Sequence, residues 1–291
     1  MTLNLNDAQS PVIEPEIHSQ SQREWGKIGL ILLVFAFFAV ILVVPVIYVF
    51  VGAFSNGLAG FLRTLSSREF LNALRLTLMA VAVAVPLNVV FGLCAALVIA
   101  RKSFRGRTFL LSVIDLPFSI SPVVAGLMLV SLYGRQGLLN PVLQAIDLRI
   151  IFSFPGIALA TILGGMPFVA REVIPVLEEI GEEEEEAAKT LGASSWQTFW
   201  RVTLPSIRWA LIYGIILTTA RAMGEFGSIA IVSSNLIGRT QTLTLFVDSS
   251  YRNYDSQGAF ATAVVLAGLA ALTLIIKQVL EHLYGHRLKV K

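Results

Sequence analysis

Six long apolar segments alternate with short polar ones along the chain. Each holds about 20 residues or more, the length that an α-helix needs to cross the hydrocarbon core of a bilayer. The pattern predicts transmembrane helices at residues 28–50, 74–100, 109–133, 151–175, 207–232 and 260–283. The first segment is too long for a secretory signal, begins too late and lacks a small-residue cleavage site. We therefore expect an all-α polytopic membrane protein with six transmembrane helices.

The domain organisation follows from these segments. We expect one membrane domain at residues 28–283, with a core at about residues 70–280, between polar tails at residues 1–27 and 284–291. Hydrophobic residues make up 55% of the chain and charged residues 14%, whereas a soluble domain carries roughly 25% charge. This composition leaves no separate soluble domain.

The distribution of Lys and Arg predicts the orientation, because cytoplasmic loops carry an excess of these residues. With six helices, both termini share a side with the loops after the second and fourth helices. That side holds twelve Lys and Arg residues and the other side seven, and the dense stretch RKSFRGR (101–107) lies on the richer side. We expect both termini to be cytoplasmic, and the net charge of +3 to reflect topology rather than nucleic-acid binding.

The loop after the fourth predicted helix, GEEEEEAAKTLGAS, is strongly acidic. Seven of the nineteen Asp and Glu residues lie between Glu178 and Glu186. A charge run is usually a solvated helix face. Gly192 follows, and a glycine just past a helix end suits the left-handed conformation that closes the helix. Residues 181–192 therefore predict a helix that ends in a glycine bend.

A second short helix is predicted directly after the bend. Ser194 and Gln197 have the spacing of a capping box, and Leu204-Pro205 is expected to end the element. Trp196 begins an i, i+3, i+4 series of aromatic residues that gives this helix a bulky edge. The aromatic edge fits either a docking surface or residence among lipid headgroups. Residues 181–205 are called the acidic loop below.

The acidic loop resembles a known signature. Glu186-Ala187-Ala188, Gly192 and Val202-Thr203-Leu204-Pro205 are similar to the EAA…G…I-x-LP pattern of the membrane subunits of type I ABC importers, with Val202 in place of Ile. The resemblance implies the type I permease fold, with a cytoplasmic coupling helix in this loop that docks on an ATP-hydrolysing subunit. It implies that the coupling residues are Glu186, Ala187, Ala188, Gly192, Ala193, Ser194, Trp196, Leu204 and Pro205.

Further segments narrow the resemblance. SPVVAG (121–126), RAMGEFGS (221–228) and longer stretches between residues 28 and 277 are similar to the CysW-type permease subunits of sulfate/thiosulfate importers. This resemblance implies a complex in the bacterial inner membrane. The complex would contain a homologous CysT-type permease, two CysA-type ATPase subunits and an external sulfate-binding protein.

The chain is expected to be a non-catalytic transport subunit. No stretch reads G-x-x-x-x-G-K-[ST], the loop that cradles phosphates, so ATP and magnesium would be bound by the partner ATPase. No constellation fits a metal site or a nucleophile. We expect no metal and no cofactor in this chain.

Charged residues inside the predicted helices are candidate functional residues. Arg221 and Glu225 are four residues apart and should project from one helix face. A charge at the bilayer centre costs about 2.5–3.5 kcal/mol, so we expect them to pair inside the bundle, with Asp115 as another possible partner for Arg221. The pair is either structural or part of an anion path. Candidate hydrogen-bonding residues for the anion are Ser119, Ser121 and Ser228.

Pro117 and Pro122 are expected to break or kink the third predicted helix where it lines a cavity. Two alternative functions stay open at this point. One is a permease for a related oxyanion, molybdate or tungstate. The other is an ion-coupled secondary transporter, which would use the same intramembrane charges but would need no exposed helix–glycine–helix loop.

Overall fold

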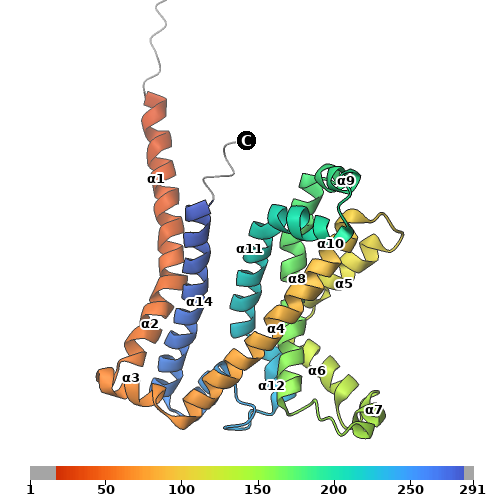
Figure 1. Ribbon diagram of the computed structural model, residues 1–291. Helices are drawn as coiled ribbons and strands as arrows, with labels where there is room; N and C mark the ends of the chain where they lie inside the picture. Colours follow the sequence, from red (N-terminus) through yellow and green to blue (C-terminus); the bar gives the residue numbers. More distant parts are fainter. Residues whose placement is uncertain (1–17, 285–291) are drawn as a thin grey trace, which may run out of the picture. The chain divides into compact units, whose positions relative to one another are not determined.

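The computed structural model describes residues 18–284, and every regular element in that range is a helix (Figure 1). Two compact units make up the chain, residues 1–48 and residues 49–291. The predicted tails before residue 18 and after residue 284 lie outside the described residues.

The first unit is a helical run that crosses into the second. It comprises α1 (His18–Phe38), the π-helix η1 (Ala39–Val43) and the beginning of α2 (Val44–Ala53). Residues 27–53 form an apolar helix long enough to span a bilayer. This helix contains the first predicted segment, residues 28–50.

The second unit contains the remaining helices. Its first half consists of α3 (Gly57–Leu65), α4 (Arg68–Arg101), α5 (Arg107–Ser119), α6 (Pro122–Tyr133), α7 (Asn140–Ala145) and α8 (Phe154–Ile180). Its second half consists of α9 (Glu183–Thr190), α10 (Ser195–Thr198), the π-helix η2 (Phe199–Thr203), α11 (Leu204–Met223), α12 (Gly227–Ser233), α13 (Leu243–Arg252) and α14 (Ser256–Tyr284).

Helices α4, α8 and α11 pack on one another to form the centre of the second unit. Val169 of α8 is fully buried between two glycines of its neighbours. A Cβ atom at Gly92 of α4 would lie 2.6 Å from the Val169 Cβ, and one at Gly214 of α11 would lie 2.9 Å from its Cα. Small residues let helices approach closely inside a membrane, where packing rather than hydrophobicity drives association.

The third predicted helix, residues 109–133, is broken. Helices α5 and α6 are bent by 110° at Ile120-Ser121. The residue before a proline is driven into an extended conformation, and Ser121, which precedes Pro122, has ψ 136°. The expected break is confirmed. Five described helices are long and apolar enough to span a membrane, and the number is six if the bent pair is counted as one span.

The fifth predicted helix, residues 207–232, has different ends in the structure. The helical run begins at Ser195 and ends at Met223, and α12 is a separate helix that follows Gly224-Glu225-Phe226. The expectation that Glu225 lies in the same helix as Arg221 was therefore wrong. Gly224 closes α11, and the Glu225 carboxylate accepts a hydrogen bond from the Ser228 N–H in the first turn of α12 at 3.3 Å.

The expected helix end at Leu204-Pro205 was also wrong. The π-helix η2 precedes this proline, and the Leu204 N–H bonds the carbonyl of Phe199, five residues back. The same arrangement precedes Pro45, where the Val44 N–H bonds the carbonyl of Ala39. A π-helical turn shifts the hydrogen-bonding register, so a proline that has no N–H to donate can follow without ending the helix.

Candidate functional site

The acidic loop folds as a helix, a glycine bend and a second helix. Helix α9 ends before Gly192, whose φ of +88° lies in the left-handed region. Ser194 and Gln197 form the predicted capping box: the Gln197 N–H donates to the Ser194 Oγ at 3.3 Å, and the Ser194 N–H donates to the Gln197 Oε1 at 2.9 Å. The predicted local geometry of the bend and of the cap is thus present.

Large apolar side chains of this loop face outward. Leu191 is 88% exposed and Trp196 is 69% exposed. Trp196, Phe199 and Trp200 pack against one another, with ring centroids between 5.4 and 6.3 Å apart. Through these contacts the three rings form one aromatic edge. Trp200, which is 50% exposed, contributes to the exposed surface of this edge.

The residues predicted to couple to an ATPase occupy this same surface. Glu186, Ala187, Gly192, Ser194, Trp196 and Pro205 are exposed, and Ala188, Ala193 and Leu204 are half-buried. An open hollow lies between α9 and the continuous helix of η2 and α11, and it is lined by Ala187, Ala188, Leu191, Val202 and Pro205, among others. The loop therefore presents both a projecting aromatic edge and a shallow hollow.

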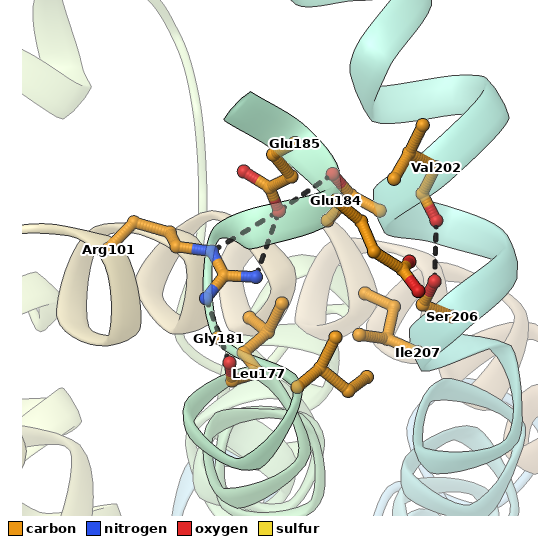
Figure 2. A pocket seen from close by; sticks show the side chains of 10 residues that line it. Arg101, Leu177, Gly181, Glu184, Glu185, Val202, Ser206 and Ile207 are labelled. Carbon is orange, nitrogen blue, oxygen red and sulfur yellow. Dashed lines mark hydrogen bonds and ion pairs between the residues drawn. The ribbon is translucent and has the colours of Figure 1, made fainter. Parts of the chain in front are cut away.

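Glu185 differs from its exposed neighbours in the run, because its side chain is only 14% exposed and its carboxylate binds Arg101 (Figure 2). Its Oε1 accepts hydrogen bonds from Arg101 Nη2 at 2.9 Å and from Thr203 Oγ1 at 3.0 Å. Arg107, in the same basic stretch as Arg101, pairs with Glu178. Sequence reasoning missed the pairing of Glu185, since nothing in five consecutive glutamates distinguishes the buried one.

Arg221 and Glu225 form the predicted ion pair, with Arg221 Nη1 2.5 Å from Glu225 Oε2. The Glu225 side chain is only 2% exposed, and its Oε1 also accepts from Ser228 Oγ at 2.7 Å. The Glu225 carbonyl accepts from Thr244 Oγ1 at 2.8 Å. The pair thus joins the end of α11 to α12 and α13. Gly164 of α8 leaves room for it, since a Cβ there would lie 3.0 Å from Glu225 Oε2.

The segments SPVVAG and EFGS, far apart in the sequence, pack together as α6 and α12. A Cβ at Gly227 would lie 2.8 Å from the Pro122 Cβ, and one at Gly126 would lie 2.9 Å from the Ser228 carbonyl oxygen. The two glycines therefore permit a close helix contact next to Glu225. Through this contact, α6 of the broken α5–α6 helix lies next to the Arg221–Glu225 ion pair.

Asp115 does not pair with Arg221 as suggested; its partner is Arg171 of α8. Arg171 Nε lies 2.8 Å from Asp115 Oδ1, and the Arg171 guanidinium lies 4.7 Å from the Phe118 ring centroid. The side chain of Arg171 is 55% exposed and that of Asp115 is 38% exposed. Arg171 was not among the predicted residues, although a charge inside a predicted transmembrane helix was a usable signal.

The three predicted serines are in different environments. Ser119 and Ser121 are exposed at the α5–α6 break, within a few residues of Asp115 and Phe118. Ser228 is buried and bonds Glu225 instead. The candidate polar residues thus divide into an exposed group at the break and a buried group around Glu225.

An all-helical membrane bundle that carries a helix–glycine–helix loop and a broken helix pair has the architecture of an importer permease. A chain in the crystal structure of a bacterial alginate ABC transporter, in complex with an alginate pentasaccharide-bound periplasmic protein, shares this fold. The TM-score is 0.75 at 20% sequence identity, and the match covers 91% of this chain and 97% of that chain.

The chain belongs to the family of binding-protein-dependent transport system inner membrane components, which matches residues 88–285. The sulfate transport system permease protein CysW of Synechocystis sp. is 56% identical over 262 residues, which cover 89% of this chain and 95% of the relative. The sulfate transport system permease protein CysT of Escherichia coli is 37% identical over 229 residues, which cover 79% of this chain and 83% of the relative. This protein is therefore a multi-pass inner-membrane permease subunit of an ABC transporter.

Proposed function

We propose that this chain is one of two homologous permease subunits of an ATP-driven importer for sulfate and thiosulfate. The observation that carries the proposal is the 56% identity to a sulfate transport permease over nearly the whole of both chains. The likeness to CysT permeases of the same transport system supports a second, homologous subunit. Two separate CysA-type ATPase subunits would bind ATP and magnesium, and an external sulfate-binding protein would deliver the anion.

The acidic loop is the proposed contact with the ATPase. Its exposed aromatic edge and the hollow beside it offer an apolar surface of the kind that a protein partner buries. The proposed contact residues are those carried by the signature, from Glu186 to Pro205. The bend at Gly192 sets the angle between the two helices of this surface.

The exposed pair at the helix break is the proposed lining of the anion path. Charged side chains within membrane spans face other protein or water rather than lipid, and both Arg171 and Asp115 are exposed on this chain. Arg171 would attract a divalent anion, and Asp115 would offset part of that attraction so that the anion is released. Ser119 and Ser121, exposed nearby, would donate hydrogen bonds to its oxygens.

Transport measurements test the proposed substrate. In cells that lack other importers, the assembled complex is expected to take up radiolabelled sulfate in an ATP-dependent manner, with thiosulfate as an efficient competitor. Efficient competition by molybdate but not by thiosulfate would identify the related oxyanion permease instead. Uptake that follows an ion gradient without ATP would identify a secondary transporter.

The proposed orientation places both termini and the acidic loop in the cytoplasm. In a Cys94→Ala background, a cysteine at the exposed position Ser195 is expected to react with an impermeant maleimide only from the cytoplasmic side. A cysteine at Ser256, exposed at the start of α14, is expected to react only from outside. The reverse labelling pattern would contradict both the Lys and Arg argument and the proposed ATPase contact.

A further inference from the structure

Arg101 joins the acidic loop to the ends of two long helices. It is the last residue of α4, and its Nη1 donates to the Leu177 carbonyl oxygen at 2.8 Å. Leu177 lies in the last turn of α8, where the carbonyls have no partner within the helix. The Nε and Nη2 atoms of the same guanidinium both donate to Glu185 Oε1, at 3.2 and 2.9 Å (Figure 2).

Glu185 extends this set of contacts to a third helix. Thr203 Oγ1 donates to the same Glu185 Oε1 at 3.0 Å. Thr203 is buried in η2, which continues without interruption into α11. A single carboxylate therefore connects the acidic loop to the ends of α4, α8 and α11, the three helices that form the centre of the second unit.

The ion pair of Arg101 and Glu185 differs from an ordinary solvated ion pair because both side chains are mostly buried. The Arg101 and Glu185 side chains are 11% and 14% exposed, whereas Glu183, Glu184 and Glu186 of the same helix are exposed. Exposed ion pairs contribute little because water screens them. A mostly buried, charge-assisted set of hydrogen bonds has stronger and more directional interactions.

The far end of α11 carries the intramembrane ion pair. Arg221 lies in the last turn of α11 and binds Glu225. Helix α11 has 20 residues and is therefore about 30 Å long. It connects the region of Thr203 to the α11–α12 junction as one continuous helix.

We propose that Glu185 is a positioning residue that transmits movement of the acidic loop to α4, α8 and α11 during the transport cycle. This inference rests on the proposed contact between the loop and an ATPase. Within the acidic run, Glu185 thus faces the membrane helices, while the exposed surface of the loop faces the partner. Glu185 acts through Arg101 and Thr203 and does not itself touch the ATPase or the anion.

The test compares variants in the complete complex, reconstituted in proteoliposomes with the sulfate-loaded binding protein. The measured quantities are ATPase retained, thermal stability and sulfate transported per ATP hydrolysed. Glu185→Ala is expected to retain the ATPase but to lower transport per ATP by about tenfold, since hydrogen bonds to a charged group are lost. Glu185→Gln, which keeps the acceptor oxygen, should give an intermediate loss, and Glu183→Ala, on an exposed residue of the same helix, should behave as wild type.

Two further variants separate transmission from general stability. Thr203→Val removes only one donor to Glu185 and should also lower transport per ATP while the ATPase stays bound. The double variant Arg101→Gln/Glu185→Ala should transport no less sulfate per ATP than the worse of Arg101→Gln and Glu185→Ala alone. The reason is that the effects of two substitutions in one shared contact do not add.

Three results would overturn the inference. They are an unchanged transport ratio in both Glu185→Ala and Thr203→Val, an equal loss in Glu183→Ala, and lower stability or abundance with a normal ratio in the molecules that remain. Failure of the proposed function would look different, because the wild-type complex itself would then retain no ATPase or would transport no sulfate.

Discussion

Gly192→Val is expected to abolish sulfate uptake while leaving the protein in the membrane at near-normal amounts. The φ of Gly192 is +88°, and a Cβ added there would have no atom within 4 Å beyond its two chain neighbours. The cost within the chain is therefore backbone strain alone, about 1–2 kcal/mol for an L-residue in the left-handed region. Valine would also project from the proposed docking surface, so the ATPase would be lost or would hydrolyse ATP without regard to substrate.

Gly57→Val is the matched control for this prediction. Gly57 has a φ of +73° and equally open surroundings, but it is the first residue of α3, outside the acidic loop. It should impose similar strain and leave uptake largely intact. Uptake, ATPase retention and stimulation by the binding protein should be measured for both variants. Normal uptake and stimulation in Gly192→Val would mean that the loop is only a solvated connector.

Arg221→Ala is expected to lower both the amount and the thermal stability of the complex. The substitution leaves the Glu225 carboxylate, which is 2% exposed, without its cationic partner. Removing one member of a buried ion pair typically costs about 3–5 kcal/mol, because the remaining charge is uncompensated. Adding Glu225→Gln to Arg221→Ala removes that charge and should restore part of the loss.

Arg171→Ala is the comparison that distinguishes a structural pair from an anion path. Its pair with Asp115 is exposed on this chain, so we expect near-normal abundance and stability together with altered sulfate uptake. Abundance and thermal melting should be measured beside uptake for both arginine variants. If Arg221→Ala were normally abundant and stable but inactive, Arg221 would belong to the anion path rather than to the packing of α11 and α12.

The elements defined by local chemistry were predictable from the sequence. The positive φ of Gly192 and the Ser194–Gln197 capping box depend on residues a few positions apart, and the break near Pro122 depends on one ring and its neighbour. The apolar segments were located for the same reason, since crossing a bilayer requires a continuous run of apolar residues.

Helix ends that depend on hydrogen-bonding register were not predictable. Pro205 indicated an end because a proline lacks an N–H, but η2 shifts the register and the helix continues. The end of α11 at Met223 lies inside a longer apolar segment, and the Glu225 carboxylate accepts a hydrogen bond from the Ser228 N–H in the first turn of α12. The hydrophobicity of a segment indicates that it lies in the bilayer, but it does not show where the backbone hydrogen bonds of a helix are interrupted.

The sequence by itself determined the class of protein, the number of apolar segments and the shape of the acidic loop, because each follows from residues that are close together along the chain. Only the tertiary structure decided that Asp115 pairs with Arg171 and Glu185 with Arg101. The pairing of Arg221 with Glu225 was predicted from their spacing, but the helix break between them was not. Two of these pairs join residues 56 and 84 positions apart. Which of these distant charges meet is set by the packing of α4, α5, α8 and α9, and a pairing across so many residues has no local signal in a single sequence.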